Sequence, residues 1–184
     1  MAWFLQKREE LENQKAITRI SSKWGSNVGN QYWQTPAYLF DALKKHFDFK
    51  LDAAANPTNN LGTELYYTEK ENGLSLPWKT WTFCNPPYSE TGLWVRKAYW
   101  EQRISGIGSV LLLPANTDTK WFHDYIWNRF DDISKESIYV KFIKKRVKYI
   151  GAKDPAKYSN MVIIFADNLY RNRYINLEPP MFIP

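Results

Sequence analysis

Four consecutive residues, Asn85, Pro86, Pro87 and Tyr88, form the arrangement in this sequence that is best suited to chemistry. The two prolines fix two φ angles and remove two N–H donors, so rigid carbonyl groups can point into a site. The Asn85 amide oxygen adds a further acceptor, and two acceptors match the two donor hydrogens of an exocyclic amino group. Because the Tyr88 ring can stack on a planar base, we predict a site for an aromatic amine.

The chemistry that such a site could support is transfer of an alkyl group to nitrogen. An aromatic amine is a weak nucleophile because its lone pair is delocalised into the ring. Two acceptors on its hydrogens would favour sp³ character and stabilise the positive charge that develops as nitrogen attacks a methyl group. A sulfonium donor leaves readily, so direct displacement requires neither a covalent enzyme intermediate nor a strong general base. The alternative interpretation is an ordinary turn at the end of a strand.

The segments around this turn alternate between apolar runs and amphipathic stretches. We predict strands at 49–55, 64–68, 81–89 (where the prolines stop it), 108–115, 137–143, 146–152 and 160–166. We predict helices at 35–47, 91–104 and 119–130, the first with Thr35 as N-cap and Pro36 at the first helical position. This order favours an α/β fold with a mostly parallel central sheet flanked by helices. Ligands bind such sheets beyond the carboxyl ends of the strands.

Composition and charge favour a nucleic acid as partner. The chain has 184 residues, 44% of them hydrophobic, and a formal net charge of +6, which attracts polyanions. Its one cysteine, Cys84, excludes an intrachain disulfide, and we predict no metal site. Neither a signal peptide nor a membrane span is evident, so we expect a cytoplasmic protein. We interpret residues 1–30 as a helical and loop extension and residues 31–184 as the catalytic domain.

Seven short motifs follow one another along the chain: YWQTP (32–36), FKLDAAA (49–55), ENGL (71–74), FCNPPYS (83–89), LLLPANTDTKWFH (111–123), KKRVKY (144–149) and SNMVIIF (159–165). Together they resemble the phage-type DNA N6-adenine methyltransferases, the Dam-like family, over roughly residues 30–166. The resemblance implies a Rossmann-like fold and S-adenosylmethionine (SAM) as cofactor. It also implies double-stranded DNA as partner, with the target adenine flipped out of the duplex.

The resemblance also implies roles for individual residues. It identifies as catalytic the four residues Asn85 to Tyr88. The residues that it implies for SAM are Trp33, Thr35, Pro36, Asp52, Ala53, Ala54 and Asn72. Those that it implies for DNA are Ser89 and the basic residues of an expected hairpin, Lys144, Lys145, Arg146 and Lys148. The LDAAA segment departs from many relatives, which have glycines where this chain has alanines.

Each of these assignments has a structural alternative. Asp52 faces the methionine amino group of SAM in the functional interpretation and is a helix N-cap in the other. Asn72 either lies near the cofactor's adenine or is a polar loop residue, and the basic hairpin either contacts DNA or is a solvated charged surface.

Other functions also remain open at this point. The same turn serves methyltransferases that act on N4 of cytosine, on RNA adenine or on a protein glutamine amide. A DNA-binding protein of this fold without catalysis is another alternative. The recognition sequence and the oligomeric state do not follow from the sequence.

Overall fold

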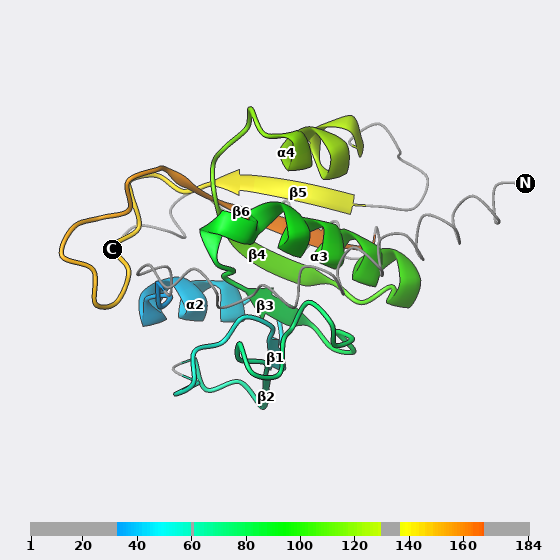
Figure 1. The fold of residues 1–184 in the computed structure, drawn as a ribbon, viewed down its shortest axis with the longest axis horizontal. Helices are drawn as coiled ribbons and strands as arrows, with labels where there is room; N and C mark the ends of the chain where they lie inside the picture. The colour runs from blue at the N-terminus through cyan, green and yellow to red at the C-terminus, as the bar shows by residue number, and fades with distance from the viewer. Residues whose placement is uncertain (1–32, 60, 130–136, 168–184) are drawn as a thin grey trace, which may run out of the picture.

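The computed structural model describes residues 33–59, 61–129 and 137–167. Its sheet has six strands in the order β2-β1-β3-β4-β6-β5, from the lower to the upper part of Figure 1. The strands are β1 (Leu51–Asp52), β2 (Leu65–Tyr66), β3 (Thr82–Cys84), β4 (Ser109–Pro114), β5 (Ser137–Phe142) and β6 (Asn160–Ala166). The helices are α2 (Ala37–Lys44), α3 (Thr91–Ser105) and α4 (Lys120–Tyr125), with 3₁₀ turns η1 (Tyr88–Glu90) and η2 (Trp127–Arg129).

Most neighbouring strands run parallel. β1 pairs in parallel with β2 and with β3, and β3 pairs in parallel with β4. β6 is antiparallel to β4, and β5 is antiparallel to β6. The predicted α/β class with a mostly parallel sheet is therefore confirmed.

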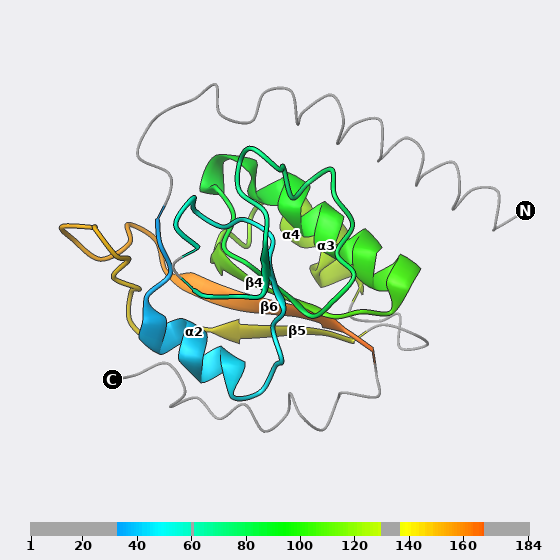
Figure 2. The same cartoon turned by 90° about the horizontal axis from the view of Figure 1, so that it is seen from below.

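The alternation of side chains along β4 explains why helices cover both faces of the sheet. Val110 and Leu112 pack with α2 on one face, whereas Leu111 and Leu113 pack with α3 on the other. Every residue of β4 is buried, as expected of a strand that is covered on both sides. Figure 2 shows α2 on one side of the sheet and α3 with α4 on the opposite side.

Two predicted elements differ in the structure. Residues 146–152 do not form a strand: they contribute only an isolated bridge between Ile150 and Gln34, and the backbone turns at Gly151 with φ of 80°. β5 pairs with β6 instead, because β6 is buried and its free edge needs a partner. The predicted helix at 119–130 is interrupted at Ile126, whose φ of −126° and ψ of −71° are not helical.

The first helix begins one residue later than predicted. α2 begins at Ala37 with Pro36 as the N-cap residue, and Pro36 supplies a backbone carbonyl to Leu39 and Phe40. The prediction of Thr35 as N-cap was therefore wrong. The expected extension, residues 1–30, lies outside the described residues. No helix in the described part of the chain has the length and apolar character that crossing a membrane requires.

Candidate active site

The polar residues singled out in the sequence lie at one edge of the sheet. Because β1 and β3 are parallel neighbours, Asp52 at the end of β1 and Asn85 just beyond β3 lie at the same carboxyl edge. The order of the strands also reverses here, since β2 lies on one side of β1 and β3 on the other. Such a switch point leaves a crevice beyond the strand ends, where open α/β sheets bind ligands.

The Asn85 side chain is held by its nitrogen, and its oxygen is left unpaired. Its Nδ2 donates to the Trp33 carbonyl oxygen at 2.8 Å and to the Thr35 hydroxyl at 3.1 Å. Both amide hydrogens are thereby used. The Oδ1 atom is buried, and no group in the described part of the chain donates to it. An unpaired buried acceptor costs about 1–3 kcal/mol, so this oxygen is poised to accept a hydrogen from a ligand.

Thr35 faces this amide because the segment that precedes α2 runs past the turn after β3. The bridge from Gln34 to Ile150 holds the same segment on its other side, with Ile150 N donating to Gln34 O at 3.0 Å. Thr35 is buried, and its hydroxyl is the group that accepts from Asn85. The structure thus brings together the TP segment and the NPPY turn, which are separated by 50 residues in the chain.

Tyr88 lies at the start of η1, and its hydroxyl is part of a buried cluster. The hydroxyl forms a hydrogen bond with that of Tyr149, and Asn160 Nδ2 donates to Tyr88 at 2.9 Å and to Tyr149 at 3.0 Å. Burial raises the pKa of Tyr88 to about 12. Burial, followed by the neighbouring Tyr88, also raises the pKa of Tyr149. Both phenols are therefore protonated at neutral pH.

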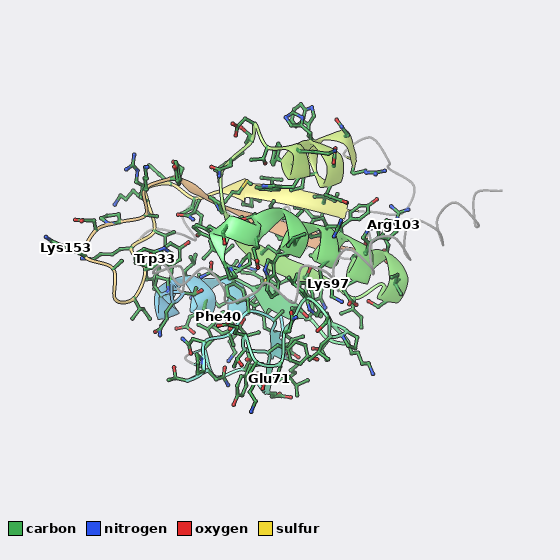
Figure 3. All side chains as sticks on the ribbon, in the orientation of Figure 1. Trp33, Phe40, Glu71, Lys97, Arg103 and Lys153 are labelled. Carbon is green, nitrogen blue, oxygen red and sulfur yellow. The ribbon has the colours of Figure 1, made fainter. Side chains whose placement is uncertain are left out.

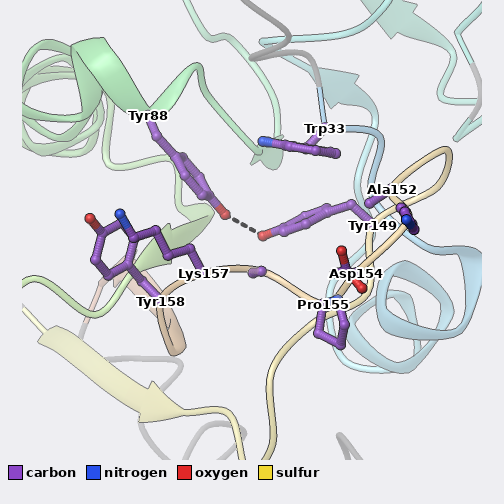
Figure 4. Close-up of a pocket in the computed structure, with 10 residues that line it drawn as sticks. Trp33, Tyr88, Tyr149, Ala152, Asp154, Pro155, Lys157 and Tyr158 are labelled. Atoms are coloured by element: carbon purple, nitrogen blue, oxygen red, sulfur yellow. Dashed lines mark hydrogen bonds between the residues drawn. The ribbon is translucent and has the colours of Figure 1, made fainter.

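A pocket of about 360 Å³ opens beside this cluster. Its walls include the rings of Trp33, Tyr88 and Tyr149, and segment 152–158 closes its other side (Figure 4). The Trp33 and Tyr149 rings lie 6.2 Å apart at 34°. Trp33, which the sequence assigned to the cofactor, thus has its ring in a pocket with Tyr88. An aromatic pocket of this volume suits a planar ligand.

Asp52 is a buried carboxylic acid that has no cation beside it. One carboxylate oxygen accepts from Ala54 N at 3.2 Å, and no lysine or arginine among the described residues forms an ion pair with it. Burial raises its pKa to about 7. Asp52 caps the turn at Ala54 rather than a helix N-terminus. A ligand cation would supply the charge that this carboxylate lacks.

The ENGL loop packs against the segment that follows Asp52. A Cβ atom at Gly73 would lie 2.0 Å from the Ala53 carbonyl oxygen and 3.2 Å from the Trp94 ring, so only glycine allows this approach. Asn72 has a φ of 61°, and its Oδ1 accepts from Leu74 N at 3.2 Å. The Asn72 amide oxygen is thus engaged within its own loop. Gly73, which the sequence analysis did not select, is the residue that brings the two loops together.

The predicted basic hairpin is instead part of the long connection between β5 and β6. Ile143, Val147 and Tyr149 are buried, whereas Lys144, Lys145, Arg146 and Lys148 are exposed between them. The hairpin prediction was therefore wrong, but the four basic side chains are accessible to solvent. Ser89 is exposed as well, on η1. Figure 3 shows Lys153 pointing outward from the same connection, at the end of the molecule where Trp33 lies.

Sequence reasoning missed two residues of this site, Tyr149 and Asn160. Both occur in the motifs KKRVKY and SNMVIIF, but neither was given a role. The available signal for Asn160 was a polar residue at the head of an otherwise apolar buried strand. For Tyr149 it was the apolar–basic–aromatic order of Val147, Lys148 and Tyr149, which places Val147 and Tyr149 inside and Lys148 outside.

Comparisons with known proteins are consistent with this arrangement. Residues 22–176 match the family model described as DNA N-6-adenine-methyltransferase (Dam). The chain is 27% identical over 121 residues to the DNA N-6-adenine-methyltransferase of Haemophilus phage HP1, a match covering 65% of this chain and 66% of that protein. It is 34% identical over 93 residues to the protein of the same description from Escherichia phage T1, covering 49% of this chain and 38% of the relative. The matches therefore span only part of each relative's length.

Proposed function

Since the chain belongs to the DNA N-6-adenine-methyltransferase (Dam) family, we propose that it transfers a methyl group from SAM to the N6 amino group of adenine in DNA. The observation that carries this proposal is the Asn85 amide, whose nitrogen is anchored and whose buried oxygen is unpaired. An exocyclic amino group is the donor that such an acceptor requires.

In this reaction Asn85 Oδ1 and the Pro86 carbonyl oxygen accept the two N6 hydrogens. This interaction strengthens as nitrogen becomes positively charged, so it lowers the barrier rather than only binding the base. Pro86 and Pro87 are buried and keep the turn rigid, so the acceptors do not reorganise during the reaction. No side chain is needed as a strong base, because the methylated ammonium loses its proton to water.

We place SAM beyond the carboxyl ends of β1 and β3, as in a Rossmann-like arrangement. The unpaired Asp52 carboxylate suits the methionine ammonium group, and the close contact of Gly73 with Ala53 shapes the loop around it. Thr35, Pro36, Ala54 and Asn72 complete the proposed set of cofactor residues, as the family resemblance implies. When bound, SAM supplies an electrophilic methyl group on a sulfonium. The protein's own part is to hold this group and exclude competing water.

The aromatic pocket receives the target base after it leaves the duplex. Flipping costs a few kcal/mol, and stacking on an aromatic ring, worth about 1–3 kcal/mol, offsets part of that cost. Tyr88 and Trp33 offer rings on the pocket wall next to the Asn85 turn. We place Trp33 at the base rather than at the cofactor for this reason.

The exposed basic residues of the β5–β6 connection supply the contacts to phosphate. In the described part of the chain, no carboxylate forms an ion pair with Lys144, Lys145, Arg146 or Lys148. These residues are exposed and lie on the connection that also forms part of the pocket wall. Ser89 lies on η1, just before α3, and would contact the strand that carries the target base. Such contacts give most of the affinity and make it depend on salt.

The proposal is tested by incubating the purified protein with SAM and unmethylated duplex DNA, followed by digestion to nucleosides and mass spectrometry. We expect N6-methyladenine from the wild type and from Asn128→Ala, which changes an exposed asparagine on η2. We expect none from Asn85→Ala.

The other outcomes separate the competing functions. N4-methylcytosine would retain the mechanism and replace the substrate. SAM binding without a methylated base would direct the search to RNA or to a protein amide. Absence of both SAM binding and product would overturn the enzymatic proposal and leave a DNA-binding protein of the same fold.

A further inference from the structure

Asn160 is a buried polar residue at the head of an otherwise apolar strand. It is 1% exposed and begins β6, in which all the following residues from Met161 to Ala166 are apolar and buried. Its Oδ1 is buried, and no described group donates to it. An unsatisfied buried oxygen costs about 1–3 kcal/mol, which offsets much of what the hydrogen bonds of the amide nitrogen contribute, among them one to the Leu113 carbonyl oxygen at 3.4 Å.

The Asn160 nitrogen holds the far end of the Tyr88 side chain. It donates to the Tyr88 hydroxyl at 2.9 Å, and the same nitrogen donates to Tyr149 at 3.0 Å. The two phenols also bond to each other, as the dashed line in Figure 4 shows. Their rings meet edge to face, with centroids 6.3 Å apart and an interplanar angle of 77°.

Tyr88 is therefore fixed at both ends. Its backbone belongs to a turn that Pro86 and Pro87 make rigid, and its hydroxyl is held by residues that lie 61 and 72 positions later in the chain. A tyrosine without these bonds could rotate about its side-chain torsions. The bonds keep the ring at one angle on the wall of the pocket.

We propose that Asn160 is a positioning residue, which sets the angle of the Tyr88 ring so that the target base is held in register with the Asn85 acceptor. This inference rests on the proposed function. It concerns orientation rather than affinity, and a misplacement of about 1 Å can cost about a hundredfold in rate. Loss of Asn160 should thus lower kcat by about tenfold to a hundredfold. The dissociation constants for SAM and DNA should change by less than about twofold.

A double-mutant cycle with Asn160→Leu and Tyr88→Phe tests this link. Tyr88→Phe keeps the ring and removes only the hydroxyl that Asn160 holds. We expect each single substitution to lower kcat by a similar factor. The kcat of the double variant should lie within about twofold of that of the less active single variant, because both changes break the same interaction. Effects that multiply, or a KM effect without a kcat effect, would overturn the proposal.

Thermal unfolding separates positioning from folding. We expect Asn160→Leu to remain folded and to melt close to the wild-type temperature, because the loss of the unsatisfied oxygen offsets the loss of the hydrogen bonds that the nitrogen donates. If that variant does not fold, Tyr149→Phe replaces it in the cycle, because it deletes the other hydroxyl while retaining the ring.

A readout that needs no reaction distinguishes failure of this inference from failure of the proposed function. In NMR spectra of tyrosine-labelled protein, the Tyr88 ring signals should shift or broaden in Asn160→Leu even if the wild type produces no methylated base. Unchanged Tyr88 signals would overturn the positioning role, whereas a wild type without product would overturn the proposed function.

Discussion

The side-chain nitrogen of Asn85 lies 3.1 Å from the hydroxyl oxygen of Thr35, which joins the turn after β3 to the segment before α2. This bond orients the amide so that its oxygen, rather than its nitrogen, is left unpaired. The hydroxyl that the sequence assigned to a helix cap therefore determines which atom the Asn85 side chain offers to a substrate.

Removing the Thr35 hydroxyl should reduce the rate of methyl transfer. Thr35→Val has nearly the same shape but cannot accept the hydrogen bond, so the Asn85 amide would keep only the Trp33 carbonyl as an anchor. We expect kcat to fall about tenfold and the free energy of unfolding to fall by about 1 kcal/mol, the usual worth of one such bond. Thr35→Ser retains the hydroxyl and should retain most of the activity. Equal loss in both variants would mean that packing, not the bond, matters.

Cofactor affinity should depend on pH through Asp52. The carboxylate must be ionised to bind an ammonium group, and burial raises its pKa to about 7. Below pH 7 we expect SAM affinity to fall by up to about tenfold per pH unit, since one pKa unit corresponds to about 1.4 kcal/mol. Above about pH 8 the ligand's own amino group loses its proton, so affinity should fall again. Calorimetric titration with SAM from pH 5.5 to 8.5 measures the fall in affinity on both sides of neutral pH.

Two controls assign this dependence to Asp52. Asp52→Asn should bind SAM weakly, and its affinity should not fall further below pH 7. Methylthioadenosine lacks the amino acid part of SAM and should bind equally well across that range. If the SAM affinity of the wild type did not fall below pH 7, the carboxylate would not face the ammonium group.

The same pKa shift predicts how stability varies with pH in the absence of ligand. The pKa of Asp52 is raised in the folded state to about 7, above its unfolded value of about 3.9. Between these values the folded state holds a proton that the unfolded state has lost. The free energy of unfolding should therefore fall as pH rises from about 4 to 7. Urea unfolding at pH 5 and pH 8 should show a smaller difference in Asp52→Asn than in the wild type.

The strand ends were predictable from the sequence, but the contacts between them were not. The all-apolar run of β4 and the proline stop after β3 specify buried strands, and parallel strands bring their ends to one edge. That reasoning placed Asp52 and Asn85 close together. The partners of each side chain depend on packing between segments that local patterns do not describe.

Two misassigned segments illustrate this limit. The alternating residues of 146–152 have the pattern of a strand, yet β6 already pairs with β4 and β5, which leaves them no free edge there. Threonine is a residue type that often caps helices, yet the Thr35 hydroxyl accepts a hydrogen bond from Asn85, 50 positions away in the chain. In both cases tertiary contacts override a local preference.

Affinity for DNA should lose part of its salt dependence when lysines of the β5–β6 connection are removed. Lys144 and Lys145 are exposed, so their replacement by alanine should not disturb the core. If each contacts a phosphate, the double variant should lower the slope of log K against log salt by about 1.8 for duplex DNA. Lys79→Ala, which changes an exposed lysine outside this connection, is the matched control. Fluorescence anisotropy at several salt concentrations measures the slopes, and equal slopes would exclude phosphate contacts at both lysines.

Gly73 should be required for both stability and cofactor binding. An added Cβ would lie 2.0 Å from the Ala53 carbonyl oxygen, which cannot move without displacing the backbone after Asp52. We therefore expect Gly73→Ala to lower the free energy of unfolding by about 1–3 kcal/mol, as overpacking does. SAM affinity should fall at least tenfold because the crevice wall shifts.

Gly106→Ala is the matched control: Gly106 has a φ of 72° at the end of α3 and no neighbour within 4 Å of an added Cβ. It should cost about 1 kcal/mol of stability through backbone strain while leaving SAM affinity unchanged. Urea unfolding and calorimetry on the two variants separate these effects, and a Gly73→Ala variant that binds SAM normally would place the cofactor away from the ENGL loop.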